Sequence, residues 1–325
     1  MNCESESLLE IKDLKIAFKT PEGIFHAVKG ISLEVGKREI VGIVGESGCG
    51  KTVTALSIMH LLPDNSVATG SIDFSGIDLL SLKENETRET HGRDISMIFQ
   101  DSLSSLNPLM KVGRQIEENL MIHTSLDSRD RFLEVLDIMN NVGLPDPEQT
   151  YNKYPHELSG GMRQRIAIAI AIVCNPDLII ADEPTTALDV TVQAQILELL
   201  RKINRESNSS IIFISHNLGV VREICSIVYV MYAGHIVEKA PVNRLFTDPA
   251  HPYTMGLIKA IPKRDSKGKE LFDIRGRVPS IADSIPGCPF EPRCDYAVER
   301  CKKEFPGFKK MANDHEARCF LAGDV

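Results

Sequence analysis

One eight-residue run constrains this chain more than any other: Gly45-Glu46-Ser47-Gly48-Cys49-Gly50-Lys51-Thr52. Its pattern is GxxxxGK followed by threonine, with the apolar run Ile40–Val44 before it and Val53–Leu56 after it. That order is the strand–loop–helix context in which such a loop works. The glycines let the backbone turn tightly and approach an anion, while backbone N–H groups and the following helix supply positive charge. The sequence therefore predicts a phosphate-binding loop rather than a glycine-rich turn with a surface lysine.

Three side chains of this loop have a chemistry of their own. We expect Lys51 to bridge the β- and γ-phosphates of a nucleotide and Thr52 to offer its hydroxyl to Mg²⁺. Two readings of Cys49 stay open. It is either a small residue that fits the loop, or an accessible thiolate that makes the site sensitive to oxidation.

A second chemical feature follows the apolar run Leu178–Ala181, which is typical of a buried parallel strand. Asp182 and Glu183 come at its end, and the carboxyl ends of such strands form the ligand-binding edge of an α/β sheet. We expect Asp182 to hold Mg²⁺ through water and Glu183 to polarise the attacking water. The alternative, a solvated acidic turn, is disfavoured by the phosphate loop earlier in the chain.

A third feature is the run Leu158-Ser159-Gly160-Gly161-Met162. It is predicted to open a helix whose N-terminus can address a phosphate.

The order of these motifs, with Gln100, Leu188-Asp189 and His216 among them, resembles the nucleotide-binding subunit of ABC transporters over nearly the whole chain. The resemblance implies an α/β fold: a P-loop NTPase ABC nucleotide-binding domain with a helical subdomain, plus a small Cys-rich C-terminal extension. It also implies that the chain hydrolyses ATP with Mg²⁺. The expected boundaries are 8–260 for the ATP-binding domain, about 101–175 for the helical subdomain, and 261–325 for the extension.

The resemblance also implies a role for individual residues. Gln100 is expected to contact Mg²⁺ and the attacking water, and His216 to contact the γ-phosphate. Asp189 is expected at the seam of a dimer. Three residues are expected to bind the γ-phosphate held by the opposite subunit: Ser159, Gly160 and Gly161.

The aromatic residue that stacks on adenine is less well defined. Phe18 resembles it, Phe25 competes with it, and either residue could instead belong to the core.

Further markers narrow the resemblance to the ATPase subunits of oligopeptide and dipeptide importers, a group that also includes nickel and other small-solute importers. These markers are Met97–Asp101 with Ser105–Pro108, Gly161–Arg165, Ala181–Thr191, His251–Thr254 and the Cys-rich tail. The implied partners are two membrane permease subunits, an extracytoplasmic solute-binding protein and a second ATPase chain. A heterodimer of ATPases is favoured over a homodimer, and the cassette is not repeated within the chain.

Composition agrees with this placement. The chain has 325 residues, 42% of them hydrophobic, which suits one large globular domain with an appendage. Its net charge of −8 argues against nucleic-acid binding through a basic face. The acidic N-terminus does not resemble a signal peptide, and the apolar runs are too short to span a bilayer. We expect a protein held peripherally at the cytoplasmic face of the inner membrane through its partners.

One alternative function is a soluble ABC-type ATPase that acts on nucleic acid or ribosomes. Such proteins usually show two cassettes, long coiled coils or basic surfaces, and this sequence indicates none of them.

The tail holds four cysteines, Cys288, Cys294, Cys301 and Cys319, with gaps of five, six and 17 residues. A tail this short cannot bury enough apolar surface to fold alone, so a bound metal that cross-links it is physically reasonable. Four thiolates suit either zinc or an iron–sulfur cluster. The family resemblance favours a 4Fe-4S cluster, with zinc and four reduced cysteines as alternatives. Because the cluster is far in sequence from Lys51 and Glu183, we expect its loss to disorder the tail and to weaken assembly or solute-coupled transport, with nucleotide binding largely spared.

Overall fold

The computed structural model describes residues 7–101, 105–186, 188–261, 272–279 and 285–323. The stretch 262–269, whose polar, Lys-rich and Gly-containing sequence predicts a linker, lies outside these residues, as do Cys3 and Ala187. The chain divides into two compact units. One unit comprises residues 36–39 and 81–214, and the other comprises residues 7–35, 40–80 and 215 onward. The second unit holds the phosphate loop and the Cys-rich tail, so it is called the loop unit here. The first is called the helical unit.

The loop unit contains an antiparallel sheet with the strand order β2-β1-β4-β5. Its strands are β1 (Ser7–Thr20), β2 (Gly23–Gly36), β4 (Ser66–Phe74) and β5 (Ile77–Asp78), followed by the short helix η1 (Leu79–Ser81). Buried and exposed residues alternate over much of β1, where Leu14 and Ile16 are buried and Lys15 is exposed. This alternation is expected for a sheet that faces the core on one side.

The same unit holds a second group of strands, in the order β11-β12-β10-β9-β3. β3 (Ile40–Val44) runs parallel to β9 (Ile227–Tyr232), and β9 forms an antiparallel hairpin with β10 (His235–Pro241). The hairpin turns at Ala233 and Gly234, whose φ angles of 46° and 86° are those of a tight two-residue turn. The sequence pattern predicts this turn, and the structure confirms it.

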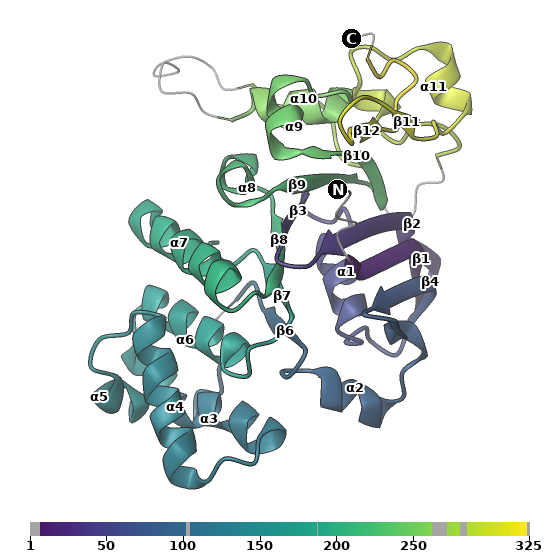
Figure 1. Ribbon diagram of the computed structural model, residues 1–325. Coiled ribbons are helices and arrows are strands. Elements are labelled where there is room, and N and C mark those ends of the chain that lie inside the picture. The colour runs from purple at the N-terminus through teal and green to yellow at the C-terminus, as the bar shows by residue number, and fades with distance from the viewer. Residues whose placement is uncertain (1–6, 102–104, 187, 262–271, 280–284, 324–325) are drawn as a thin grey trace, which may run out of the picture. The chain divides into compact units, whose positions relative to one another are not determined.

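The C-terminal tail belongs to the loop unit through backbone pairing. β12 (Glu316–Ala317) pairs with β10 and with β11 (Lys309–Lys310), as Figure 1 shows at the yellow end of the chain. The helices of this unit are α1 (Lys51–Ile58), α8 (Leu218–Ile224), α9 (Val242–Thr247), α10 (Pro252–Lys259), η4 (Glu291–Arg293) and α11 (Glu299–Lys303).

The helical unit has three parallel strands in the order β8-β7-β6. They are β6 (Ile95–Ile98), β7 (Leu178–Asp182) and β8 (Ser210–Ser215), and every residue of β7 and β8 is buried. Near-continuous apolar runs are expected of parallel strands covered on both faces. Because the strands are parallel, their carboxyl ends meet at one edge.

The helices of this unit are α2 (Glu84–Thr90), α3 (Val112–His123), α4 (Ser128–Asn141), α5 (Pro147–Tyr151), η2 (Pro155–Glu157), α6 (Gly160–Ile172) and α7 (Val190–Glu206). Helices α3 to α6 pack against one another (Figure 1). Asp127 caps α4 by accepting from two backbone N–H groups, and Val135 and Met139 of that helix are fully buried. The sequence predicts a helix here, because Phe132, Val135, Leu136 and Met139 fall at helical spacing and are expected in the core. The structure confirms the helix, although Phe132 and Leu136 are only half-buried.

None of the helices in the described part of the chain has the length and apolarity needed to cross a membrane.

Candidate nucleotide-binding site

The phosphate loop has the backbone that its glycines predict. It joins the end of β3 to the start of α1, and Gly48 and Gly50 have φ angles of 79° and 108°. A Cβ atom at Gly45 would lie 2.1 Å from the Met231 carbonyl oxygen, so that position requires glycine. The loop therefore keeps its N–H groups near the N-terminus of α1, where an anion is stabilised.

Lys51 is held inside the loop. Its ammonium donates to the carbonyl oxygens of Gly45 (2.8 Å) and Glu46 (3.0 Å), and the side chain is 5% exposed. Cys49 is fully buried, and burial raises the pKa of its thiol. The reading of Cys49 as an accessible, oxidation-sensitive thiolate is therefore wrong, because a buried neutral thiol is a poor nucleophile.

In the helical unit, the structure brings Glu183 and Gln100 together. Gln100 follows β6 and donates from Nε2 to Glu183 Oε2 at 2.9 Å, and the Thr186 hydroxyl donates to the same oxygen at 3.0 Å. Asp182, the last residue of β7, is 1% exposed.

Glu183 also has an uncommon backbone conformation. Its φ angle is 48°, and its N–H donates to the Ile214 carbonyl oxygen at 2.9 Å. A left-handed conformation at a non-glycine residue costs energy and is frequent at functional sites. The backbone conformation and the hydrogen bonds from Gln100 and Thr186 together hold the Glu183 side chain in one orientation at the end of β7.

The Ser159 run begins a helix, as predicted. Ser159 is the N-cap of α6, and its Oγ accepts from the Met162 N–H at 3.3 Å. Ser159 is exposed, whereas Leu158 before it is buried. Gly161 is constrained too, since a Cβ there would lie 3.0 Å from Val192. The first turn of a 13-residue helix is thereby open to an anion.

Asp189 is exposed and caps α7, where its carboxylate accepts from the N–H groups of Thr191 and Val192, both at 3.0 Å. This cap gives Asp189 a structural task of its own.

His216, in the loop unit, is exposed just after β8. Phe18 in β1 and Phe25 in β2 are both half-exposed, so their burial does not distinguish the two adenine-stacking candidates.

The four cysteines of the tail line one small cavity of about 20 Å³. The Cys288 N–H donates to the Cys301 carbonyl oxygen at 2.8 Å. Burial raises the pKa of the Cys288 thiol to about 12. All four are free cysteines.

The arrangement of these thiols is not that of a metal site as it stands. Among the described residues, no group of three or more His, Cys, Asp or Glu side chains is placed to hold a metal ion. The geometry therefore does not support the expected iron–sulfur cluster or other metal binding. The four predicted cysteines nevertheless line the same cavity.

Sequence analysis missed two contacts of the phosphate loop. The Glu46 N–H donates to the buried Tyr253 hydroxyl at 2.9 Å, and the Glu46 carboxylate pairs with Arg293 at 2.9 Å. The His251–Thr254 run, which resembles the family at the sequence level, also has a structural role: His251 caps α10 by accepting from the Tyr253 N–H at 3.1 Å. Arg293 lies beside Cys294 in the tail. The tail is therefore far from the loop in sequence but in contact with it in space.

These features define an ATP-binding cassette, with a phosphate loop after one strand and a hydrogen-bonded carboxylate after another. Residues 28–186 match the ABC transporter family, and residues 237–301 match the C-terminal region of oligopeptide/dipeptide transporters. The chain belongs to the ATP-binding proteins of peptide ABC transporters. It is accordingly an ABC ATPase, and the predicted family and fold are confirmed.

Relatives align along nearly the whole chain. The dipeptide transport ATP-binding protein DppD of Bacillus subtilis is 46% identical over 97% of this chain and 95% of its own length. The oligopeptide transport ATP-binding protein OppD of Salmonella typhimurium is 47% identical over 92% of this chain and 89% of its own length. A probable peptide ABC transporter ATP-binding protein of Sinorhizobium fredii is 45% identical over 100% of this chain and 98% of its own length.

Among solved structures, the ATP-binding cassette MJ0796 in a dimeric post-hydrolysis state with ADP and Pi is similar. It has a TM-score of 0.65 and 27% identity, and the match covers 72% of this chain and 98% of that one. The match supports the cassette fold.

Proposed function

We propose that this chain is the ATP-hydrolysing subunit that powers uptake of di- and oligopeptides by an ABC importer. One observation carries the proposal: the similarity to peptide and dipeptide transport proteins extends over the cassette and also over the C-terminal region 237–301. A soluble ATPase acting on nucleic acid or ribosomes lacks that support. The importer would place the chain at the cytoplasmic face of the membrane, bound to two permease subunits and served by an extracytoplasmic solute-binding protein.

The proposed site residues follow the chemistry of the loop and the strand end. Lys51 and the loop N–H groups bind the phosphates of ATP, and Thr52 and Asp182 hold Mg²⁺. Glu183 accepts a proton from the attacking water, and Gln100 orients that carboxylate through its 2.9 Å hydrogen bond. His216 contacts the γ-phosphate, and Phe18 stacks on adenine.

Two such chains are proposed to meet head to tail. Ser159, Gly160 and Gly161 of one chain then face the γ-phosphate bound by the other, with Asp189 at the seam. ATP favours the closed dimer because it makes contacts there that are missing in the open state. The partner is a second, similar ATPase; a homodimer is the alternative. The proposed domains are 8–260, with a helical subdomain at about 101–175, and 261–325.

For the tail we propose a 4Fe-4S cluster held by Cys288, Cys294, Cys301 and Cys319. What supports it is the convergence of four free thiols on one cavity with the apolar neighbours Phe290 and Leu321. Thiolates suit iron–sulfur clusters and zinc alike. When bound, the group would cross-link the tail through its metal–thiolate bonds and so stabilise a segment with little hydrophobic core of its own. Zinc is the alternative.

The transport function is tested by peptide uptake in cells that lack this chain. Labelled di- and tripeptides should accumulate only when the chain is restored, and a labelled free amino acid should accumulate equally in both strains. Unchanged peptide uptake without the chain, together with lost uptake of nickel or another small solute, would assign the importer to a different solute.

A further inference from the structure

Arg293 of the Cys-rich tail makes a saturated set of hydrogen bonds. Its Nη1 and Nη2 contact the two Glu46 carboxylate oxygens at 2.9 and 3.2 Å. Nη1 also donates to the Tyr232 hydroxyl (3.3 Å), Nη2 to the Ile274 carbonyl oxygen (3.0 Å) and Nε to the Arg275 carbonyl oxygen (3.0 Å). A guanidinium has five N–H donors, so each of them has an acceptor. The side chain is only 5% exposed.

The carboxylate that Arg293 engages belongs to the phosphate loop. Glu46 is the second residue of the loop, its N–H donates to Tyr253, and its carbonyl accepts from Lys51. An uncompensated carboxylate there would repel the phosphates of a nucleotide. The bidentate contact neutralises the charge and fixes the direction of the side chain, because paired guanidinium–carboxylate bonds are strong and directional.

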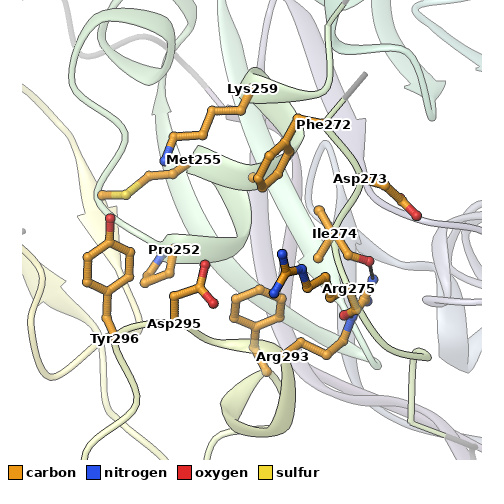
Figure 2. Close-up of a pocket in the computed structure, with 12 residues that line it drawn as sticks. Pro252, Met255, Lys259, Phe272, Asp273, Ile274, Arg275, Arg293, Asp295 and Tyr296 are labelled. Carbon is orange, nitrogen blue, oxygen red and sulfur yellow. Dashed lines mark hydrogen bonds between the residues drawn. The ribbon is translucent and has the colours of Figure 1, made fainter. Parts of the chain in front are cut away.

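Arg293 is itself held by the surrounding packing. Figure 2 shows it on the wall of a pocket of about 180 Å³, with Arg275 and Ile274 on the same pocket. A Cβ at Gly256 of α10 would lie 3.0 Å from Ile274, so the 272–275 segment packs closely against α10. This packing places two backbone carbonyls where the guanidinium needs them.

An aromatic cluster connects the same region to the cysteine cavity. Phe290 lines that cavity, and its ring lies 5.4 Å from the Tyr253 ring and 5.3 Å from the Tyr232 ring. Both tyrosines contact the Glu46–Arg293 pair through their hydroxyls. The tail therefore reaches the phosphate loop through two sets of contacts within one compact unit.

We propose that Arg293 is a positioning residue for nucleotide binding: by neutralising Glu46 and fixing the phosphate loop, it makes the Cys-rich tail a contributor to ATP affinity. The inference rests on one part of the proposed function, namely that this loop binds ATP. It differs from the expectation that nucleotide binding is largely spared when the tail loses its cluster.

The test is a double-mutant cycle on the full chain, with the affinity for a fluorescent ATP analogue as the readout. Arg293→Met keeps an unbranched apolar stem and removes the charged guanidinium. It should raise Kd about fivefold or more, within the range typical of coupled sites. In a Glu46→Gln background, which removes the carboxylate, the same change should raise Kd less than about twofold. Arg293→Lys, which keeps a charge without the bidentate fork, should be intermediate.

The cycle separates positioning from folding. A role in stability alone would give the same fold-change in Kd in both backgrounds, and that result would overturn the inference, as would an unchanged Kd in Arg293→Met. Lys302→Met is the matched control, because Lys302 pairs with Glu299 on the surface of α11; its Kd should equal that of the wild type. A wild-type chain that did not bind the analogue would instead overturn the nucleotide assignment itself.

Discussion

The side-chain amide of Gln100 donates a 2.9 Å hydrogen bond to the Glu183 carboxylate. The two residues are 83 positions apart, yet they meet because each follows one of two adjacent parallel strands, β6 and β7. The Thr186 hydroxyl shares the same carboxylate oxygen, which leaves the side chain little freedom to turn. A carboxylate that is oriented before substrate arrives loses less entropy in the reaction.

Lys51→Ala should weaken both ATP binding and hydrolysis. We expect the ammonium to contact the phosphates, and the loop carbonyls of Gly45 and Glu46 hold it within the loop. Affinity for ATP and turnover should be measured on the same preparation. Lys12→Ala, which removes an exposed partner of Glu10, is the control. Undiminished ATP affinity in Lys51→Ala would argue against the phosphate-loop assignment.

Ser159→Asp should block closure of the ATP-bound dimer, while Ser159→Asn should allow it. Both residues are good N-caps, so α6 keeps its first turn in either variant. Only the aspartate places a negative charge opposite the γ-phosphate bound by the other subunit. Dimer formation with ATP is measured by light scattering in a hydrolysis-deficient background. Equal dimerisation of the two variants would remove Ser159 from the nucleotide interface.

Protein purified without oxygen should contain about four iron and four sulfide per chain and absorb broadly near 400 nm, as thiolate-held clusters do. Replacing any one of Cys288, Cys294, Cys301 and Cys319 by serine should lose the iron, whereas Cys174→Ser should retain it. Stoichiometric zinc without iron would contradict the cluster and indicate a zinc site instead. The absence of both metals would indicate four reduced cysteines without a metal.

Glu117→Gln should lower the free energy of unfolding of the helical unit by about 1.5–3 kcal/mol, the range for hydrogen bonds to a charged group. The Glu117 carboxylate is 1% exposed and accepts from Tyr151 (2.7 Å), Arg114 (2.8 Å) and Arg131 (3.3 Å). Urea unfolding measures the change. Glu118→Gln, on the exposed side of the same helix, should have little effect.

The same carboxylate predicts a pH dependence. Burial alone would raise the pKa of Glu117, but the hydrogen bonds from Tyr151 and Arg131, with the charge of Arg114, outweigh it, and the pKa is lowered. A pKa below the unfolded value of about 4.3 means that the stabilisation is complete above that pH and declines as pH falls through the folded value. Glu117→Gln should lack this decline. A variant that lost stability in acid as steeply as the wild type would contradict the assignment.

Features encoded over short stretches of chain were predictable, and those made by distant residues were not. The phosphate loop and the turn at Ala233–Gly234 follow from glycine and strand patterns that are complete within a few residues. The left-handed backbone at Glu183 occurs together with a hydrogen bond to Ile214, a distant residue that the local sequence does not reveal. The pair of Glu46 with Arg293 joins positions 247 residues apart, and two-residue strands such as β12 carry no readable pattern.

The turnover of Glu183→Gln in the assembled transporter tests the central claim most directly. The substitution keeps the shape of the side chain and removes its ability to accept a proton, and a positioned general base is worth about 10²–10⁴-fold. ATP hydrolysis should therefore slow by that factor while the affinity for ATP stays close to that of the wild type. Hydrolysis at the wild-type rate, with peptide uptake intact, would contradict the account.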